Sequence, residues 1–389
     1  MSNNITRYYI FNFFSLFILF DGTLTLYFQQ KLGLSFYQVT LTYAVFALLV
    51  GILEIPTGVF ADKLGYKKTM AIASLCMIIA AVGYSLSTNI YHLILVEIFW
   101  ALGFSLNSGT QDSFLYNSLK ETGEQDRFNS ILGRGNALMF TGLATSAILG
   151  GLLARYDLAL PVRLGFLPLI IPFLVVLTFK EPQIVRSELN HFQHVKESFK
   201  FILFQPKLRF ILFYIAILAV AFESVFKFSQ PYMQQLGIPI PFISMSFSCS
   251  YLLSAGGALV GQGLNRFLGE KKMFLLLYLC IFITLLLLKV NTIFALMGLV
   301  VLSPLFEGIH GPVTTGFINR HTKSRIRATV NSITNLSRSL ITAIALPLFG
   351  IIAEYSITLI FFINAAAIFI GFFVVRIWYK KLHHQQLST

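Results

Sequence analysis

Residues Glu54 to Thr69 read E-I-P-T-G-V-F-A-D-K-L-G-Y-K-K-T and lie between two long apolar runs. Gly58 and Ala61 place small residues at the end of the first run, where they let a neighbouring helix come close. Asp62 marks the point where the chain leaves the hydrocarbon, and Gly65 supplies a permissive backbone for a tight turn. The stretch predicts a turn between two membrane spans, held on the cytoplasmic side by three basic residues: Lys63, Lys67 and Lys68.

The composition of the 389-residue chain is that of an integral membrane protein, because 56% of its residues are hydrophobic and only 12% are charged. A soluble domain carries about 25% charged residues. The net charge of +13 is spread through short loops, which favours the positive-inside pattern of membrane proteins over nucleic-acid binding. Each spanning helix takes about 20 apolar residues, so the chain is long enough for about twelve spans with their connections.

The apolar runs define the expected topology. The longest polar connection, at residues 181–205, divides the spans six and six. The sequence therefore predicts an all-α membrane protein with an N-terminal bundle at 1–180, a cytoplasmic linker at 181–205 and a C-terminal bundle at 206–389. Most of the 29 Lys and Arg residues then fall on one side, which places both termini in the cytoplasm and the protein in the inner membrane. We expect spans at 5–28, 36–61, 69–87, 92–118, 130–155, 158–180, 206–235, 240–266, 272–290, 292–320, 326–352 and 355–380.

The two halves of the chain repeat in the same orientation. The loop after Gly58 returns in modified form after Gly261, with Asn265 in place of Asp62, about 200 residues later. The tripeptide 129–131 (N-S-I) returns at 331–333 with a similar offset. A repeat of this kind is typical of transporters built from two parallel halves.

The loop signature Gly58-x-x-x-Asp62-Lys63-x-Gly65-x-Lys67-Lys68 closely resembles the one between the second and third helices of the major facilitator superfamily. The E-I-P-T-G run at 54–58 and the run at 109–116 look like those of bacterial permeases and drug exporters. The resemblance implies twelve helices in two pseudo-symmetric six-helix bundles. It also implies an inner gate in which Asp62 approaches the inner end of the eleventh span, built from Gly58, Asp62, Lys63, Gly65, Lys67, Lys68, Asp112 and Arg134.

The fifth span bears on the exporter hypothesis. Proton-antiporting exporters of the superfamily carry G-x-x-x-G-P-x-x-G-G at this place. Here the run is Gly142-L-A-T-Ser146-Ala147-I-L-Gly150-Gly151, which keeps the final glycine pair and replaces Gly-Pro with Ser-Ala. All of these residues are small, so close helix packing is still expected. The antiporter hypothesis is left open by this departure.

Ionisable residues inside the spans need partners, a cavity or a proton, because a charge at the helix centre costs roughly 2.5–3.5 kcal/mol on insertion scales. Equal depth suggests ion pairs between Glu307 and Arg338 and between Asp112 and Arg134. The inside gate implied by the resemblance would instead pair Asp112 with Lys63 or Lys67. Glu223 and Lys227 lie four residues apart on one helical face. These pairings are each expected to be structural.

The pairing leaves three acids unassigned: Asp21, Glu54 and Glu97. Glu54 belongs to the E-I-P-T-G run and is interpreted as structural. The resemblance implies that spans 1, 4, 7 and 10 line a central cavity, so the proton-coupling candidates are Asp21, Glu97, Glu307 and His310. Glu307 and His310 alone, without further His or Cys, do not indicate a metal site. The candidates for the substrate cavity are Asn107, Gln111, Glu223, Lys227, Gln230, Tyr232 and Arg338.

These features predict a secondary active transporter that works by alternating access, with a small-molecule substrate, protons and the lipid bilayer as its partners. The excess of acids favours proton-coupled export of a cationic or amphipathic compound. Proton-driven import of a small metabolite or siderophore is the alternative, and a non-transporting receptor or scaffold is the alternative of another class. No nucleophile–base set and no G-x-x-x-x-G-K-[ST] loop is present in the sequence, so we predict no enzyme, no ATP-driven pump and no cofactor. We expect a monomer.

Overall fold

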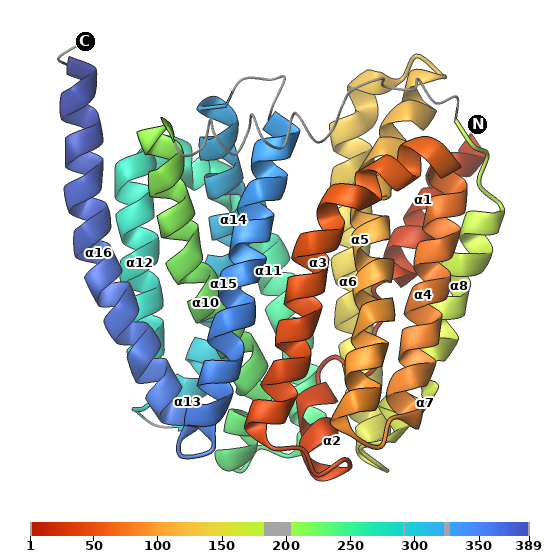
Figure 1. Ribbon diagram of the computed structural model, residues 1–389, viewed down its shortest axis with the longest axis horizontal. Coiled ribbons are helices and arrows are strands. Elements are labelled where there is room, and N and C mark those ends of the chain that lie inside the picture. The colour runs from red at the N-terminus through yellow and green to blue at the C-terminus, as the bar shows by residue number, and fades with distance from the viewer. Residues whose placement is uncertain (1, 183–203, 291, 323–326, 388–389) are drawn as a thin grey trace. The chain divides into compact units, whose positions relative to one another are not determined.

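The computed structural model describes residues 2–182, 204–290, 292–322 and 327–387. Most of the predicted linker at 181–205 lies outside the described part, and Gly58 and Asp62 are described only by their place in a helix. Within this part, every regular element is a helix (Figure 1): α1 (Ser2–Ser15), α2 (Leu24–Gln30), α3 (Phe36–Leu64), α4 (Tyr66–Leu86), α5 (Ile90–Lys120), η1 (Gln125–Arg127), α6 (Phe128–Ala154), α7 (Leu160–Leu164), α8 (Phe166–Leu177), α10 (Pro206–Gln235), α11 (Ile240–Leu268), α12 (Glu270–Leu287), α13 (Thr292–Leu296), η2 (Met297–Leu302), α14 (Ser303–Arg320), α15 (Arg327–Ala353) and α16 (Ile357–Leu387).

The described residues fall into two compact units. Unit 1 holds residues 2–182 together with 237–252, and unit 2 holds residues 204–236 together with 253–387. The first part of α11 therefore belongs to unit 1 and the rest of this helix to unit 2. The domain boundaries expected from the sequence stay a prediction.

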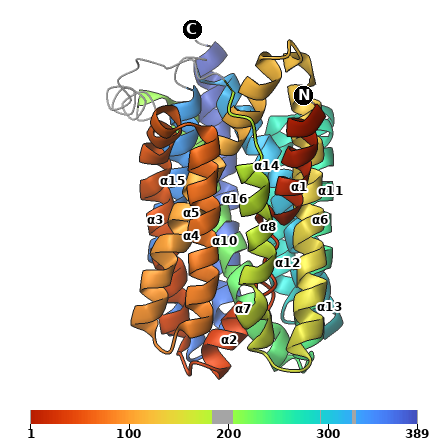
Figure 2. The same cartoon turned by 90° about the vertical axis from the view of Figure 1, so that its right-hand side faces the viewer.

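Unit 1 is organised around α4 and α5, which pack along each other, with α3 against α5 and α8 against α4 (Figure 1). Helices α7 and α8 follow each other end to end, and α8 also packs against α1 (Figure 2). Aromatic rings fill the space where α1, α5 and the end of α8 meet. Phe114 stacks on Phe179 with ring centroids 4.5 Å apart, and Phe11 adds a tilted contact to Phe179.

Helices α1 and α6 approach each other through glycine. A Cβ added at Gly142 would lie 1.9 Å from the carbonyl oxygen of Phe13, and one at Gly150 would lie 1.9 Å from the carbonyl oxygen of Leu19. Only glycine fits at such distances. The small-residue run of the fifth span therefore serves close packing against the first span, as its composition predicts.

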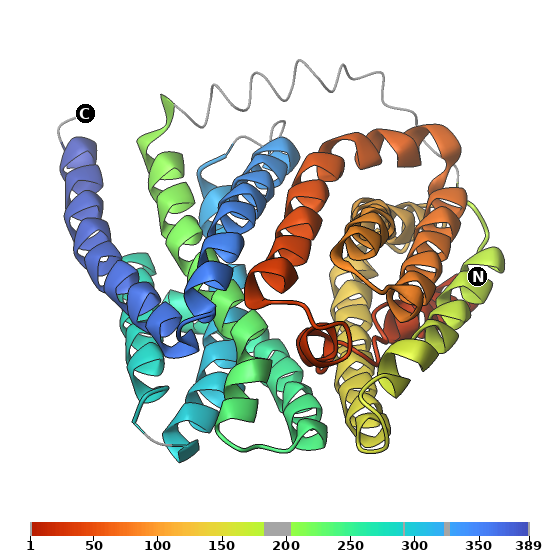
Figure 3. The same ribbon diagram turned by 60° about the horizontal axis from the view of Figure 1, so that its bottom comes forward.

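Unit 2 packs α16 against α10 and α12 (Figure 3). Its core is aromatic: Tyr214 on α10 contacts Phe274 and Tyr278 on α12, with ring centroids 4.6 and 5.0 Å apart. Glycine again allows close backbone contact, because a Cβ at Gly308 would lie 2.0 Å from the carbonyl oxygen of Ser254.

Ten helical segments in the described part are long and apolar enough to cross a membrane. Two expected spans do not count among them, so the number twelve stays a prediction. Helix α12 begins with Glu270, Lys271 and Lys272, which lowers its apolar character. The first expected span, at 5–28, contains two helices, α1 and α2, with an interruption between them. Asp21, Gly22 and Thr23 lie in this interruption, and all three residue types disfavour helix interiors.

Candidate functional site

The interruption between α1 and α2 places a carboxylate beside another helix of unit 1. Residues 16–23 form successive turns, with the amide of Ile18 donating to Leu16 and that of Thr23 donating to Phe20. Gly22 lets α11 come close, since a Cβ there would lie 2.8 Å from the Cα of Ser244. The hydroxyl of Tyr251, also on α11, donates to the carboxylate of Asp21.

Glu97 lies deep inside unit 1, where its side chain is 1% exposed. The Tyr84 side chain hydrogen-bonds to it, and Tyr43 interacts with it electrostatically. Asp21 interacts electrostatically with the same two tyrosines. The structure therefore brings the two predicted proton-coupling acids of this unit around one pair of buried tyrosines.

The Tyr43 hydroxyl extends this cluster, because it lies 2.8 Å from the hydroxyl of Thr25 on α2. Sequence reasoning identified Asp21 and Glu97 and missed Thr25, Tyr43, Tyr84 and Tyr251. Phenol groups are common in apolar runs, so composition did not single them out. Their position beside the acids is visible only in the fold.

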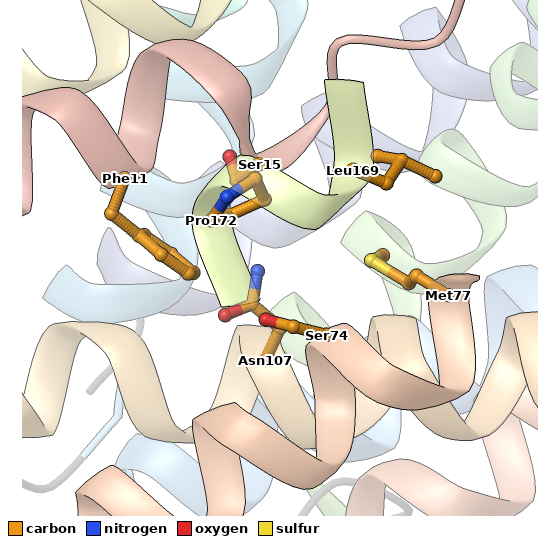
Figure 4. Close-up of a pocket in the computed structure, with 7 residues that line it drawn as sticks. All are labelled: Phe11, Ser15, Ser74, Met77, Asn107, Leu169 and Pro172. Atoms are coloured by element: carbon orange, nitrogen blue, oxygen red, sulfur yellow. The ribbon is translucent and has the colours of Figure 1, made fainter. Parts of the chain in front are cut away.

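Asn107 and Gln111 are one helical turn apart on α5 and have different surroundings. Asn107 points into a small cavity between α1, α4, α5 and α8, which has no room for a water molecule (Figure 4). Its Oδ1 atom is buried and has no hydrogen-bond partner within the described residues. Gln111 is half-buried, and its Nε2 donates to Oδ1 of the buried Asn12 over 2.5 Å.

The expected inner-gate residues lie mainly at one end of unit 1. Lys63 and Lys68 are exposed, and Gly65 has φ +92, a conformation that favours glycine. A carboxylate that the sequence reasoning missed anchors this turn: Glu181 accepts hydrogen bonds from the backbone amides of Tyr66 and Lys67 over 2.6 and 2.8 Å. The expected gate contact of Asp62 lies outside the described side chains.

The expected ion pair between Asp112 and Arg134 is absent from the described part of the chain, and both side chains are exposed. The prediction of this pair rests on the equal depth of the two residues in their spans. Depth along a helix does not fix the direction in which a side chain points, so equal depth was not sufficient for contact.

Unit 2 carries a second group of charges on α10, α14 and α15. Arg338 Nη2 lies 3.3 Å from Glu223 Oε1 and forms an ion pair with it. Glu307 interacts electrostatically with both members of this pair. His310 is 9% exposed and lies between the rings of Tyr214 and Phe222, each with its centroid 5.8 Å away.

One pair expected from spacing is not formed in unit 2: Glu223 pairs with Arg338 on another helix instead of with Lys227 on its own. Arg338 also interacts electrostatically with Glu307, its expected partner. The Lys227 ammonium lies over the ring of Phe226, 5.3 Å from its centroid. The side chains of Arg338 and Glu223 are 42% and 28% exposed, and both residues lie well inside spans. Charges inside spans usually face a protein interior or a water-filled cavity and pair with one another, and the Glu223–Arg338 pair fits this pattern.

The two remaining cavity candidates of unit 2 are buried. Gln230 is 3% exposed and Tyr232 is 6% exposed. The hydroxyl of Tyr232 donates to the carbonyl of Leu288, which follows the last turn of α12, and its ring contacts Phe361 edge to face. Tyr232 thus contributes to packing within unit 2.

Comparison with known proteins agrees with a helical membrane fold that has polar groups inside its spans. The family profile described as Major Facilitator Superfamily matches residues 8–288 and 212–388. The chain belongs to the Major Facilitator Superfamily, a family of membrane transporters.

An uncharacterised MFS-type transporter, YxaM of Bacillus subtilis (strain 168), is 28% identical over 232 residues, and the match covers 57% of this chain and 55% of that protein. The match thus spans about half the length of this curated relative.

Solved structures resemble the whole fold at low sequence identity. The nucleoside transporter NupG has a TM-score of 0.82 at 15% identity, covering 98% of this chain and 100% of that one. A POT family transporter in complex with 5-aminolevulinic acid has a TM-score of 0.77 at 12% identity, covering 97% of this chain and 96% of that one. A D-xylose-proton symporter has a TM-score of 0.74 at 13% identity, covering 97% of each chain. At these identities the likeness shows the fold alone.

Proposed function

We propose that the protein is a proton-coupled secondary transporter of a small molecule, which it exports by alternating access. The observation that carries the proposal is the cluster of half-buried Asp21 and buried Glu97 around the buried Tyr43 and Tyr84 in unit 1. Carboxyl groups inside a membrane span are energetically costly and therefore rare. Those that occur usually have a function, and proton transfer is a common one.

The surroundings of Asp21 suggest how a proton would act on the fold. The Tyr251 hydroxyl donates to the ionised carboxylate, which makes a charge-assisted hydrogen bond. Protonation of Asp21 would replace this bond with a weaker neutral one. The proton would thereby loosen the contact between the interrupted first span and α11, and its release would restore the contact.

The polar groups of the two units support a cationic or amphipathic substrate. Within unit 1, the carboxylate of Asp112 is exposed and the amide of Gln111 is half-buried. Within unit 2, the side chains of the Glu223–Arg338 pair are partly exposed. Acidic and amide oxygens suit a substrate with N–H or O–H groups, while Arg338 suits a partly anionic or dipolar region.

Proton-driven import is the second candidate. It is supported by the similar fold of the nucleoside transporter and of the D-xylose-proton symporter. Both candidates use the same acids and differ in the direction of net flux.

The test is transport in proteoliposomes with an imposed pH gradient, using radiolabelled nucleosides, sugars, peptides and lipophilic cations. Asp21→Asn and Glu97→Gln are measured separately, with Asp126→Asn, an exposed acid next to a loop, as the control. We expect at least one of the two variants to lose gradient-driven accumulation while it keeps exchange of substrate. If both variants accumulate substrate with the wild-type pH dependence, the proton site lies elsewhere, and Glu307 and His310 are the next candidates. Absence of flux for every compound would favour a receptor or scaffold.

A further inference from the structure

Asn12 on α1 has a fixed orientation in unit 1. Its Nδ2 atom donates to the backbone carbonyl oxygen of Tyr8 over 2.8 Å. A carbonyl oxygen can only accept a hydrogen bond, so the amide nitrogen of Asn12 must lie on that side. The Oδ1 atom of Asn12 therefore faces the other way, and the side chain is 0% exposed.

This orientation determines which end of the Gln111 amide on α5 faces Asn12. The Oδ1 atom of Asn12 can only accept, so the group of Gln111 that lies 2.5 Å away must be the Nε2 donor. The Tyr8 hydroxyl also lies beside both amides. The nitrogen end of Gln111 is thus turned into unit 1, and its carbonyl oxygen Oε1 is turned away.

The Oε1 atom of Gln111 is accessible. It accepts no hydrogen bond from the described residues, and it is not among the enclosed polar atoms that lack a partner. Gln111 lies inside the candidate span Ile90–Lys120. An accessible amide oxygen inside a span is costly next to lipid, which cannot donate a hydrogen bond. The oxygen therefore faces water or a ligand.

The neighbouring groups have the same polarity. Asp112, the next residue, presents an exposed carboxylate. Asn107, one turn earlier, has its oxygen atom unpartnered inside the small cavity of Figure 4. The hydroxyls of Ser15 and Ser74, which also line this cavity, donate to backbone carbonyls of their own helices. This part of α5 presents acceptor oxygens, and the Tyr8 hydroxyl beside Gln111 is buried.

We infer that Gln111 is a specificity-determining residue, which binds a hydroxyl or N–H group of the substrate through Oε1, and that Asn12 is the positioning residue that sets this polarity. The inference rests on the proposed transport function and narrows its substrate to compounds with a hydrogen-bond donor at this place. A site that accepts a hydrogen bond from the substrate rejects an analogue without that donor, because the acceptor atom of the protein is then left unpaired.

Matched pairs of probes test this assignment on the purified full-length protein. Each pair is a compound and its analogue without one donor: uridine and its deoxy analogues, D-xylose and its monodeoxy analogues, and a primary alkylamine and its quaternary counterpart. Binding is measured by thermal shift and by equilibrium dialysis. For the wild-type protein we expect one donor-bearing probe to bind about tenfold more tightly than its analogue, as one hydrogen bond implies.

Four variants separate the roles. Gln111→Leu should remove the preference while leaving the affinity for the analogue unchanged. Asn12→Leu should reduce the preference to a few-fold, because the amide of Gln111 can then turn either end outward. Gln111→Glu keeps an outward acceptor but loses the N–H that Asn12 Oδ1 accepts, so it should retain part of the preference that Gln111→Leu loses entirely, which a purely structural role would not predict. Gln125→Leu, at an exposed position in η1, is the matched control.

Two outcomes would overturn the assignment: an unchanged preference in Gln111→Leu, or a wild-type protein that binds no donor-bearing probe better than its analogue. These outcomes are distinct from failure of the proposed function. If the binding preference for the donor-bearing probe depends on Gln111 but no probe shows gradient-driven flux, the result would contradict only the transport proposal.

Discussion

Glu181 caps the first turn of α4 from a distant part of unit 1: its Oε1 accepts from the backbone amide of Tyr66 over 2.6 Å, and its Oε2 accepts from that of Lys67 over 2.8 Å. The first amides of a helix have no partner within the helix, and a carboxylate there also meets the positive end of the helix dipole. Glu181 lies so close to Gly65 that a Cβ at Gly65 would be 3.0 Å from its Oε1. The turn between α3 and α4 is thus tied to the end of the sixth predicted span.

Removing this cap should destabilise unit 1. We expect Glu181→Ala to lower the stability by about 1 kcal/mol, the usual cost of losing a helix cap, and Glu181→Gln to lower it by less. The measurement is the thermal midpoint in detergent, with Asp126→Asn as the control for loss of a surface acid. An unchanged midpoint in Glu181→Ala would show that water replaces the carboxylate without cost.

The Glu223–Arg338 pair should be energetically coupled. We expect a double-mutant cycle with Glu223→Gln and Arg338→Gln to give an interaction energy of about 0.5–1 kcal/mol, because the pair is partly exposed to water. Either single change strands one charge inside a span, so each should cost more than the double change. Thermal midpoint and protein yield report the result.

The same cycle run with Glu307→Gln and Arg338→Gln is the comparison, since Glu307 interacts with Arg338 electrostatically. We expect a smaller interaction energy there. Equal coupling in both cycles would mean that Arg338 is shared between the two acids.

Because α6 packs closely on α1, the stability of the protein should depend steeply on the size of the residue at position 142. Gly142→Ala would place a Cβ 1.9 Å from the carbonyl oxygen of Phe13, so one helix must move away. We expect a loss of about 1–3 kcal/mol, typical of overpacking. Gly133→Ala on the same helix is the matched control, because a Cβ there meets nothing within 4 Å. Equal thermal midpoints for the two variants would contradict the packing.

The ionised carboxylate of Asp157 should stabilise the fold, and this contribution should be lost only at acid pH. The hydrogen bond from Lys31 and that from the backbone of Ala159 hold the pKa of this carboxyl below its ordinary value. A lowered pKa in the folded state contributes stability above the ordinary pKa of the unfolded chain. That contribution is lost as the pH falls through the folded pKa.

Asp157→Asn should therefore be less stable than wild type near neutral pH, and the difference should shrink as the pH falls through the lowered pKa of Asp157 and vanish below it. Thermal midpoints across the pH range check this, at low and high salt, since an exposed pair is screened. A difference that persists in acid would point to packing instead of charge.

Much of the fold could be predicted from residue order. The apolar runs, the basic loops and the repeat of Gly65 as Gly269, both with positive φ, follow from local chemistry. Each depends only on residues near one another in the chain. The candidate acids Asp21 and Glu97 could also be selected in this way, because charge in an apolar run is visible without a structure.

The partners of those residues were decided only by the tertiary structure. Spacing gives the depth of a residue and its face on one helix, but not the rotation of the neighbouring helix. For that reason spacing predicts a pair of Glu223 with Lys227 on its own helix, while the fold pairs Glu223 with Arg338. The interruption of the first span, the tyrosines around Asp21 and Glu97, and the orientation of Gln111 by Asn12 likewise arise where segments distant in sequence meet, and side-chain polarity there is set by the neighbour.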